Sequence, residues 1–152
     1  MSIFRELGVR EGKDRQNEEV VYSVARAYMF LDQRISRLLN QYNLSPAKFN
    51  ILLMVKHVGL DKGMPQNALS KQLLVTTSNI TRMVDKLENE DCVERLAQKG
   101  DRRVNLIRIT DKGSKLLDKV WPQYKELVDG LISEQFSFKE KQMLSKMLQT
   151  FK

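Results

Sequence analysis

Two groups of polar side chains in the second half of the chain have the chemistry to contact a nucleic acid. The first group is basic: Lys99, Arg102, Arg103 and Arg108 stand close together, with Asp101 as their one acidic neighbour. Ammonium and guanidinium groups bind phosphate oxygens, and such contacts hold a protein on a duplex without reading its sequence. An arginine also fits into a narrow minor groove, where A·T-rich DNA concentrates negative potential.

The second group stands earlier in the chain, in the stretch TTSNITR. Its hydroxyl, amide and guanidinium groups match the donors and acceptors that base edges display in the major groove. On a helical wheel, Ser78 and Arg82 point away from the apolar side of the segment, and Asn79 and Thr81 lie at the margins. This polar side is therefore predicted to face outward.

A pair of short helices and a hairpin would position both groups. The segment ALSKQLL predicts a first helix, and the polar cluster TTS ends it and caps a second helix over residues 78–90. Residues 92–97 and 104–110 predict two strands, joined by the loop QKGDRR. Two short helices followed by a hairpin with a basic loop form a winged helix-turn-helix, whose second helix enters the major groove.

Longer helices flank this core on its N-terminal side. Apolar residues recur every three or four positions over residues 14–42, which predicts one long amphipathic helix. Ser45 and Pro46 supply the cap and first position of a second helix, which is predicted to end near Gly59. The loop LDKGMP follows it.

Two more helices are predicted after the hairpin. One begins at Thr110 or Asp111 and contains Pro122, and the last begins at a capping box made by Ser137 and Glu140. The predicted fold class is therefore mostly α with a small β-hairpin wing. It is a winged helix-turn-helix with long N- and C-terminal helices.

Composition limits the class of protein. A chain of 152 residues, 41% apolar and 30% charged, fits one folded domain. No apolar run approaches the roughly 20 residues of a membrane span, so we expect a cytoplasmic protein with no membrane partner. The net charge of +7 suits a nucleic-acid partner. Basic and acidic residues nearly balance over residues 66–111, so the local arrangement matters more than the total charge.

Groupings for other chemistries are missing from the sequence. The single Cys92 cannot form an internal disulfide, and with the lone His57 it predicts no metal site. Cys92 is expected to be a small buried residue, and Trp121 and the methionines at helical spacing are expected in the core. Neither paired carboxylates, nor a nucleophile with a base, nor a phosphate-binding glycine loop occurs, so we expect neither an enzyme nor a cofactor.

The stretch LSKQLLVTTSNITRMVDKLENEDCVERLAQKGDRRVNLIRITDKG resembles the core of the MarR (multiple-antibiotic-resistance regulator) family. The family pattern is a reading helix ending in T-R-x-V-D-x-L-E, a V-E-R strand, a D-x-R wing and an L-T-x-K-G entry into the next helix. The counterparts here are Thr81, Arg82, Val84, Asp85, Leu87, Glu88, Val93, Glu94, Arg95, Asp101, Arg103, Thr110, Lys112 and Gly113. Ile109 replaces the usual leucine.

The resemblance implies a homodimer on double-stranded DNA, with interlocked terminal helices and one winged domain per subunit. The chain then divides into a single domain, 1–152, with a DNA-binding core at 45–111 and a helical dimerisation region at 10–44 and 112–152. A two-fold dimer reads a pseudo-palindrome with half-sites roughly 34 to 36 Å apart. The flanking helices carry more apolar residues than the core can cover, which agrees with a partner subunit.

The resemblance also implies a sequence-specific transcriptional regulator, in its simplest form a repressor. Similar family members bind small aromatic or phenolic anions between the winged domain and the dimer helices. No motif in this chain identifies the ligand or the residues of its pocket.

The predicted DNA contacts fall into sets with different roles. The residues predicted to reach base edges in the major groove are Ser78, Asn79, Thr81 and Arg82. The residues predicted to bind phosphate are Thr77, Lys99 and Arg102. Arg103 is similar to the family's wing arginine, which enters the minor groove. Asp101 is expected to be structural, pairing with a neighbouring arginine to hold the wing, because a carboxylate facing phosphate would be repelled.

A second class of function uses the same elements. A winged helix can be a protein-interaction module, whose helix and hairpin meet an acidic protein surface instead of DNA. Affinity for DNA that falls linearly with salt on logarithmic axes separates the two hypotheses.

Overall fold

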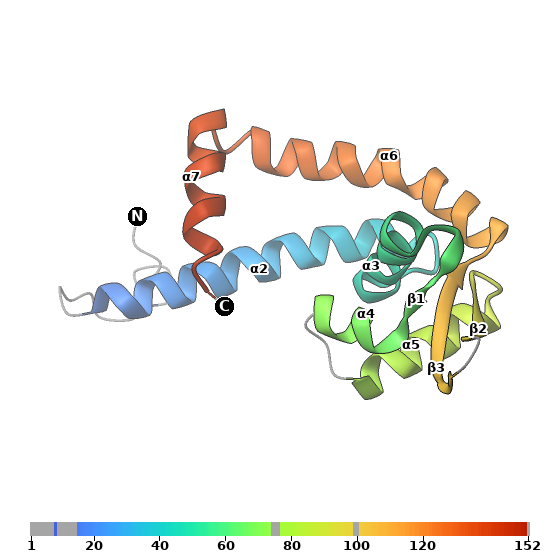
Figure 1. The fold of residues 1–152 in the computed structure, drawn as a ribbon. Coiled ribbons are helices and arrows are strands. Elements are labelled where there is room, and N and C mark those ends of the chain that lie inside the picture. The colour runs from blue at the N-terminus through green and yellow to red at the C-terminus, as the bar shows by residue number, and fades with distance from the viewer. Residues whose placement is uncertain (1–7, 9–14, 74–76, 99–100, 152) are drawn as a thin grey trace.

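The computed structural model describes residue 8 and the ranges 15–73, 77–98 and 101–151. Its α-helices are α2 (Gln16–Asn40), α3 (Pro46–Met54), α4 (Gln66–Gln72), α5 (Thr77–Asn89), α6 (Asp111–Ser133) and α7 (Phe138–Leu148). Its strands are β1 (Met64–Pro65), β2 (Val93–Gln98) and β3 (Asp101–Ile109), in the antiparallel order β1-β3-β2. One lobe holds α3, α4, α5 and the sheet, and α2 and α6 extend from it (Figure 1). The predicted fold class is confirmed.

The helix α2 occupies most of the stretch predicted from its apolar periodicity. Its C-terminal end packs into the lobe, where Leu39 is fully buried and Ile35 contacts the core. Farther from the lobe its apolar side chains are exposed, including Tyr28 at 67% and Met29 at 69%. This arm therefore carries apolar surface that the described part of one chain does not cover.

The core of the lobe lies where α3, α5 and the sheet meet. Ser45 caps α3 as predicted, because its Oγ accepts a hydrogen bond from the backbone N–H of Lys48 at 3.3 Å. The predicted inward side of α5 is confirmed, since Ile80, Val84 and Leu87 are all buried. The other fully buried large side chains include Leu39, Leu44, Phe49, Ile51, Leu52, Leu69, Ile107 and Leu117.

The sheet has a strand that the predicted two-stranded hairpin lacked. The predicted loop LDKGMP contains β1, whose Met64 and Pro65 pair with Ile107 and Leu106. The strand β3 is therefore central, which explains why two apolar residues stand side by side in it. Gly63, with a φ of 75°, permits the approach, because a Cβ there would lie 3.0 Å from the carbonyl oxygen of Ile107.

The wing loop is also shorter than predicted. The strand β3 begins at Asp101, so Arg102 and Arg103 have strand backbone instead of lying in a loop. Gln98 pairs with Asp101 while Ala97 pairs with Asn105, and this shift of register is a bulge on β3. The prediction of a six-residue loop was wrong because nothing local in the sequence marks where a bulged strand begins.

The helix predicted to continue to Gly59 changes geometry on the way. It is α-helical only to Met54, and Val55–Gly59 form a π-helix followed by a 3-10 turn at Leu60–Lys62. A Cβ on Gly59 would lie 3.2 Å from the backbone nitrogen of Met64, so the chain passes close to itself here. This turn leads directly into β1.

The T-x-K-G motif has a physical explanation at the start of α6. The Oγ1 of Thr110 accepts from the backbone N–H of Gly113 at 3.1 Å and donates to the carbonyl oxygen of Asp91 at 2.6 Å. Lys112 bonds the side chain of Asp91 at 3.4 Å. A Cβ on Gly113 would overlap the carbonyl oxygen of Cys92. The motif thus joins the start of α6 to the segment between α5 and β2.

The last helix begins at the capping box predicted from the sequence. The backbone N–H of Ser137 donates to Oε2 of Glu140 at 2.8 Å, and that of Glu140 donates to Oγ of Ser137 at 3.4 Å. The side-chain hydrogen bond from Ser137 holds the pKa of Glu140 below its ordinary value. Beyond the cap, α7 leaves its apolar residues exposed, with Phe138 at 74%.

Some residues expected in the core are on the surface of the single chain. Trp121 is 42% exposed, and Met143 and Met147 are exposed too. Helical spacing identified an apolar side correctly but could not show whether the same chain covers it. None of the helices in the described ranges is long and apolar enough to cross a membrane.

Candidate nucleic-acid interface

The helix α5 lies at the end of the lobe away from α6 (Figure 1). Ser78 and Arg82 are exposed, as predicted, and Asn79 and Thr81 are half-buried. The guanidinium of Arg82 donates to Oδ1 of Asn79 at 3.3 Å. This one-turn contact uses one of the five guanidinium donors of Arg82, which stays exposed on the helix surface.

Thr81 connects α5 to the helix before it. Its Oγ1 accepts a hydrogen bond from Nε2 of Gln66 at 2.8 Å, and Gln66 is the first residue of α4. The Oε1 of Gln66 is buried without a hydrogen-bond partner in the described residues. Thr81 therefore braces the helix pair, and its predicted contact with a base edge remains a prediction.

Arg95 neutralises the acidic residues of α5. Its guanidinium forms ion pairs with Asp85 and with Glu88, and it reaches both from β2. These two carboxylates would otherwise repel a phosphate backbone next to the predicted reading face. This partner was not predicted from the sequence, although the spacing of three residues between the two carboxylates on one helix side was an available signal.

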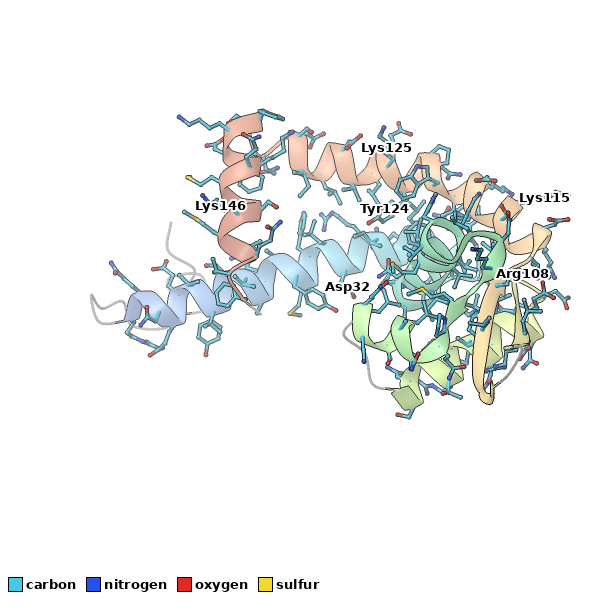
Figure 2. The ribbon with its side chains drawn as sticks, viewed as in Figure 1. Asp32, Arg108, Lys115, Tyr124, Lys125 and Lys146 are labelled. Carbon is cyan, nitrogen blue, oxygen red and sulfur yellow. The ribbon has the colours of Figure 1, made fainter. Side chains whose placement is uncertain are left out.

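The wing carries a second ion pair on its strands. Arg108, labelled on β3 in Figure 2, bonds Glu94 of β2 at 2.8 Å, and these residues are cross-strand neighbours. Arg108 therefore belongs to the wing's own structure, although it contributed to the local basic excess in the sequence.

Several predicted site residues lie partly or wholly outside what the structure describes. Lys99 lies outside the described residues. The backbones of Thr77, Asp101, Arg102 and Arg103 belong to α5 and β3, but their side chains are outside the described part. The contacts predicted for these five residues, including the pairing of Asp101 with a neighbouring arginine, therefore stay predictions.

Two observations place the wing beside α5. The strand β2 contacts α5, and Arg95 links the two elements. The antiparallel pairing places the end of β2 and the start of β3 together, at the same end of the lobe as α5 (Figure 1). A helix with outward polar groups and an adjacent basic hairpin can occupy a major groove and the neighbouring backbone together.

The described residues show no arrangement for other chemistry. They contain no group of three or more histidine, cysteine or acidic side chains able to hold a metal ion. Cys92 is buried as predicted, and burial raises the pKa of its thiol. A buried protonated thiol is a packing residue.

Comparison with known proteins identifies the family. Residues 44–104, which include the helix pair and most of the wing, match the model of the MarR family. The HTH-type transcriptional regulator MhqR of Bacillus subtilis (strain 168) is 31% identical over 125 residues. The match covers 82% of this chain and 83% of MhqR.

Solved structures share the fold over nearly the whole chain. Sco3205, a MarR family regulator from Streptomyces coelicolor in complex with DNA, has a TM-score of 0.84 at 18% identity, covering 93% of this chain and 88% of that one. CouR from Rhodococcus jostii RHA1, bound to p-coumaroyl-CoA, has a TM-score of 0.76 at 20% identity, covering 88% and 92%. With the resemblance to MhqR, the chain belongs to the MarR family of winged helix-turn-helix transcriptional regulators.

Proposed function

We propose that this regulator is a repressor that binds a pseudo-palindromic operator as a homodimer and releases it when a small aromatic or phenolic anion binds. The observation that carries the proposal is the outward polar side of α5, with Ser78 and Arg82 exposed next to the wing. Sco3205, whose fold is shared, is in complex with DNA, which supports a DNA partner for this chain.

Uncovered apolar surface supports the homodimer. Tyr28 and Met29 on α2 and Phe138 and Met147 on α7 are all more than half exposed. Many exposed apolar side chains on the same elements are typical of an interaction surface. A second copy related by two-fold symmetry would cover these residues of α2 and α7. It would also set two reading helices roughly 34 to 36 Å apart.

The residues proposed to contact DNA have distinct roles. Major-groove reading is assigned to Ser78, Asn79, Thr81 and Arg82, and phosphate binding to Thr77, Lys99 and Arg102. Arg103 is assigned to the minor groove, and Asp101 to support of the wing.

Salt dependence and Arg103→Ala test this assignment. We expect log affinity for operators selected from genomic DNA to fall linearly with log salt, at about 0.9 per phosphate contact. Arg103→Ala should weaken binding to every tight site, because the wing contact is made on each half-site. Fluorescence anisotropy over a salt series measures both effects. Absence of binding to any genomic fragment at low salt would support the protein-interaction module instead.

An aromatic cluster supports the ligand response. Phe49 of α3 lies 4.7 Å from Tyr124 and 6.4 Å from Trp121 between ring centroids, and both partners belong to α6. Figure 2 shows Tyr124 on the side of α6 that faces α2 and the lobe. Trp121 of α6 is 42% exposed, so an aromatic molecule could stack on its indole ring near the start of the lobe. CouR, which shares the fold, is bound to p-coumaroyl-CoA, and the coumaroyl group of that ligand is phenolic.

The single tryptophan makes the ligand response measurable. We expect 4-hydroxybenzoate to change Trp121 fluorescence and, over the same concentration range, to release operator DNA. Cyclohexanecarboxylate, an anion of similar size without an aromatic ring, is the control and should do neither. Equal effects of the two anions would contradict an aromatic stacking site.

A further inference from the structure

Lys48 is the one charged residue that the described part of the chain buries. Its side chain is 7% exposed, and its ammonium group lies 2.6 and 2.7 Å from the two carboxylate oxygens of Glu90. The third contact is the carbonyl oxygen of Asn43, at 3.0 Å. Three donors therefore meet three acceptors, and the buried charge is fully satisfied.

These contacts join the α2–α3 corner and the start of α3 to the end of α5, which lies 42 residues beyond Lys48. Asn43 lies in the corner between α2 and α3, Lys48 lies in the first turn of α3, and Glu90 directly follows α5. Asn43 has a φ of 56°, which asparagine tolerates better than most residues, and its Nδ2 also lies 3.5 Å from Oε1 of Glu90. The ammonium group thus lies between the C-terminal ends of α2 and α5, where helix dipoles favour a cation.

Glu90 is 33% exposed, so the ion pair is only partly buried, and such a pair contributes less to stability than to geometry. Well-packed neutral side chains can replace such a pair at little cost in free energy, whereas loss of one partner leaves an unpaired charge. What the pair supplies is a fixed distance and direction between the groups that it joins. Here those groups are the end of the reading helix and the end of the long arm.

We propose that Lys48 and Glu90 are positioning residues that fix the reading helix α5 relative to the arm α2. In a dimer, the position of the two arms then determines the distance between the two reading helices. This inference rests on the proposed function only for its effect on DNA. If the arms of two subunits interlock, the ion pair, together with the contact of Asn43 with Glu90, connects the end of each arm to the end of each reading helix. Without it, α5 keeps its core packing but loses the contact that sets its orientation.

The test removes the charges without leaving one unpaired. Lys48→Met together with Glu90→Gln keeps both side-chain sizes, and we expect its melting temperature to stay within about 5 °C of the parent. The matched control is Lys56→Met with Asp118→Asn, which removes the ion pair between the π-helix and α6 without touching α5. Glu90→Gln alone, which keeps an acceptor for Lys48, replaces the double variant if that variant does not fold.

The first measurement is the distance between α2 and α5 in solution. Spin labels on cysteines introduced at Arg37 and Lys86, both exposed, report this distance by pulsed electron resonance in a Cys92→Ala background. Labelled chain is diluted with unlabelled chain so that only distances within one chain are read. We expect the distance distribution to widen or shift in Lys48→Met/Glu90→Gln and not in the control pair. An unchanged distribution in the folded double variant would overturn the proposal.

The second measurement is the ratio of operator affinity to non-specific DNA affinity. We expect this ratio to fall by about tenfold in the double variant, with an unchanged salt slope, because the phosphate contacts remain. A widened distance distribution with an unchanged ratio would overturn the claim that the pair serves DNA reading. If the unsubstituted chain prefers no DNA sequence, the proposed function fails, and the distance measurement alone decides whether Lys48 and Glu90 position α5.

Discussion

Gly113→Ala should lower the free energy of unfolding by about 3 kcal/mol or more, and the melting temperature by about 10 °C. A Cβ at this position would overlap the carbonyl oxygen of Cys92, which is backbone and cannot rotate away. The same oxygen accepts the backbone N–H of Thr110 at 3.1 Å, so relief of the overlap would break the connection between α6 and the lobe. Thermal and urea unfolding monitored by circular dichroism measure the effect.

Gly130→Ala is the matched control for this substitution. Gly130 lies in the same helix, and a Cβ there would meet no atom within 4 Å. Alanine is the better helix former by about 0.5 to 1 kcal/mol, so this variant should be at least as stable as the parent. Equal destabilisation by the two substitutions would mean that the close approach to Cys92 does not explain the glycine of the T-x-K-G motif.

Arg82→Ala should weaken operator binding by about tenfold to a hundredfold, and should do so mainly for sites with the preferred base. The loss corresponds to the roughly 1 to 3 kcal/mol that one good arginine–base contact supplies. Arg82 is exposed on α5 and is held only by Asn79 in the described contacts, so its removal leaves the core intact. Binding to a set of operators with single base changes measures both affinity and preference.

Lys86→Ala provides the comparison on the same helix. Lys86 is exposed one turn after Arg82, so it tests the loss of one positive charge without the predicted base contact. We expect a small and uniform decrease across sequences. If Arg82→Ala also weakens all sequences uniformly, Arg82 binds phosphate and does not read a base.

The helix α5 was predictable because its signals are local. Its apolar residues repeat with the helical period, and the buried Ile80, Val84 and Leu87 confirm the side that the wheel assigned to the core. The caps at Ser45 and Ser137 are similarly set by residues three positions apart. Such features need no knowledge of the rest of the chain.

The features that were missed depend on residues far apart in sequence. The strand β1 has two residues and forms only because Met64 and Pro65 meet the central strand β3. A lysine in the first turn of a helix looks solvated, and only the fold brings Glu90, 42 residues later, to Lys48. Likewise, the apolar spacing around Trp121 could not show that one chain leaves this residue partly exposed.

The carbonyl oxygen of Cys92 connects the base of the wing to the start of α6. That single atom accepts the N–H of Thr110 and is in close contact with Gly113, so it couples the first turn of α6 to the base of β2. We therefore expect a rotation of α6 to move the hairpin with it. Because the hairpin extends away from Cys92, a small tilt of α6 would produce a displacement of the hairpin that grows with distance from Cys92.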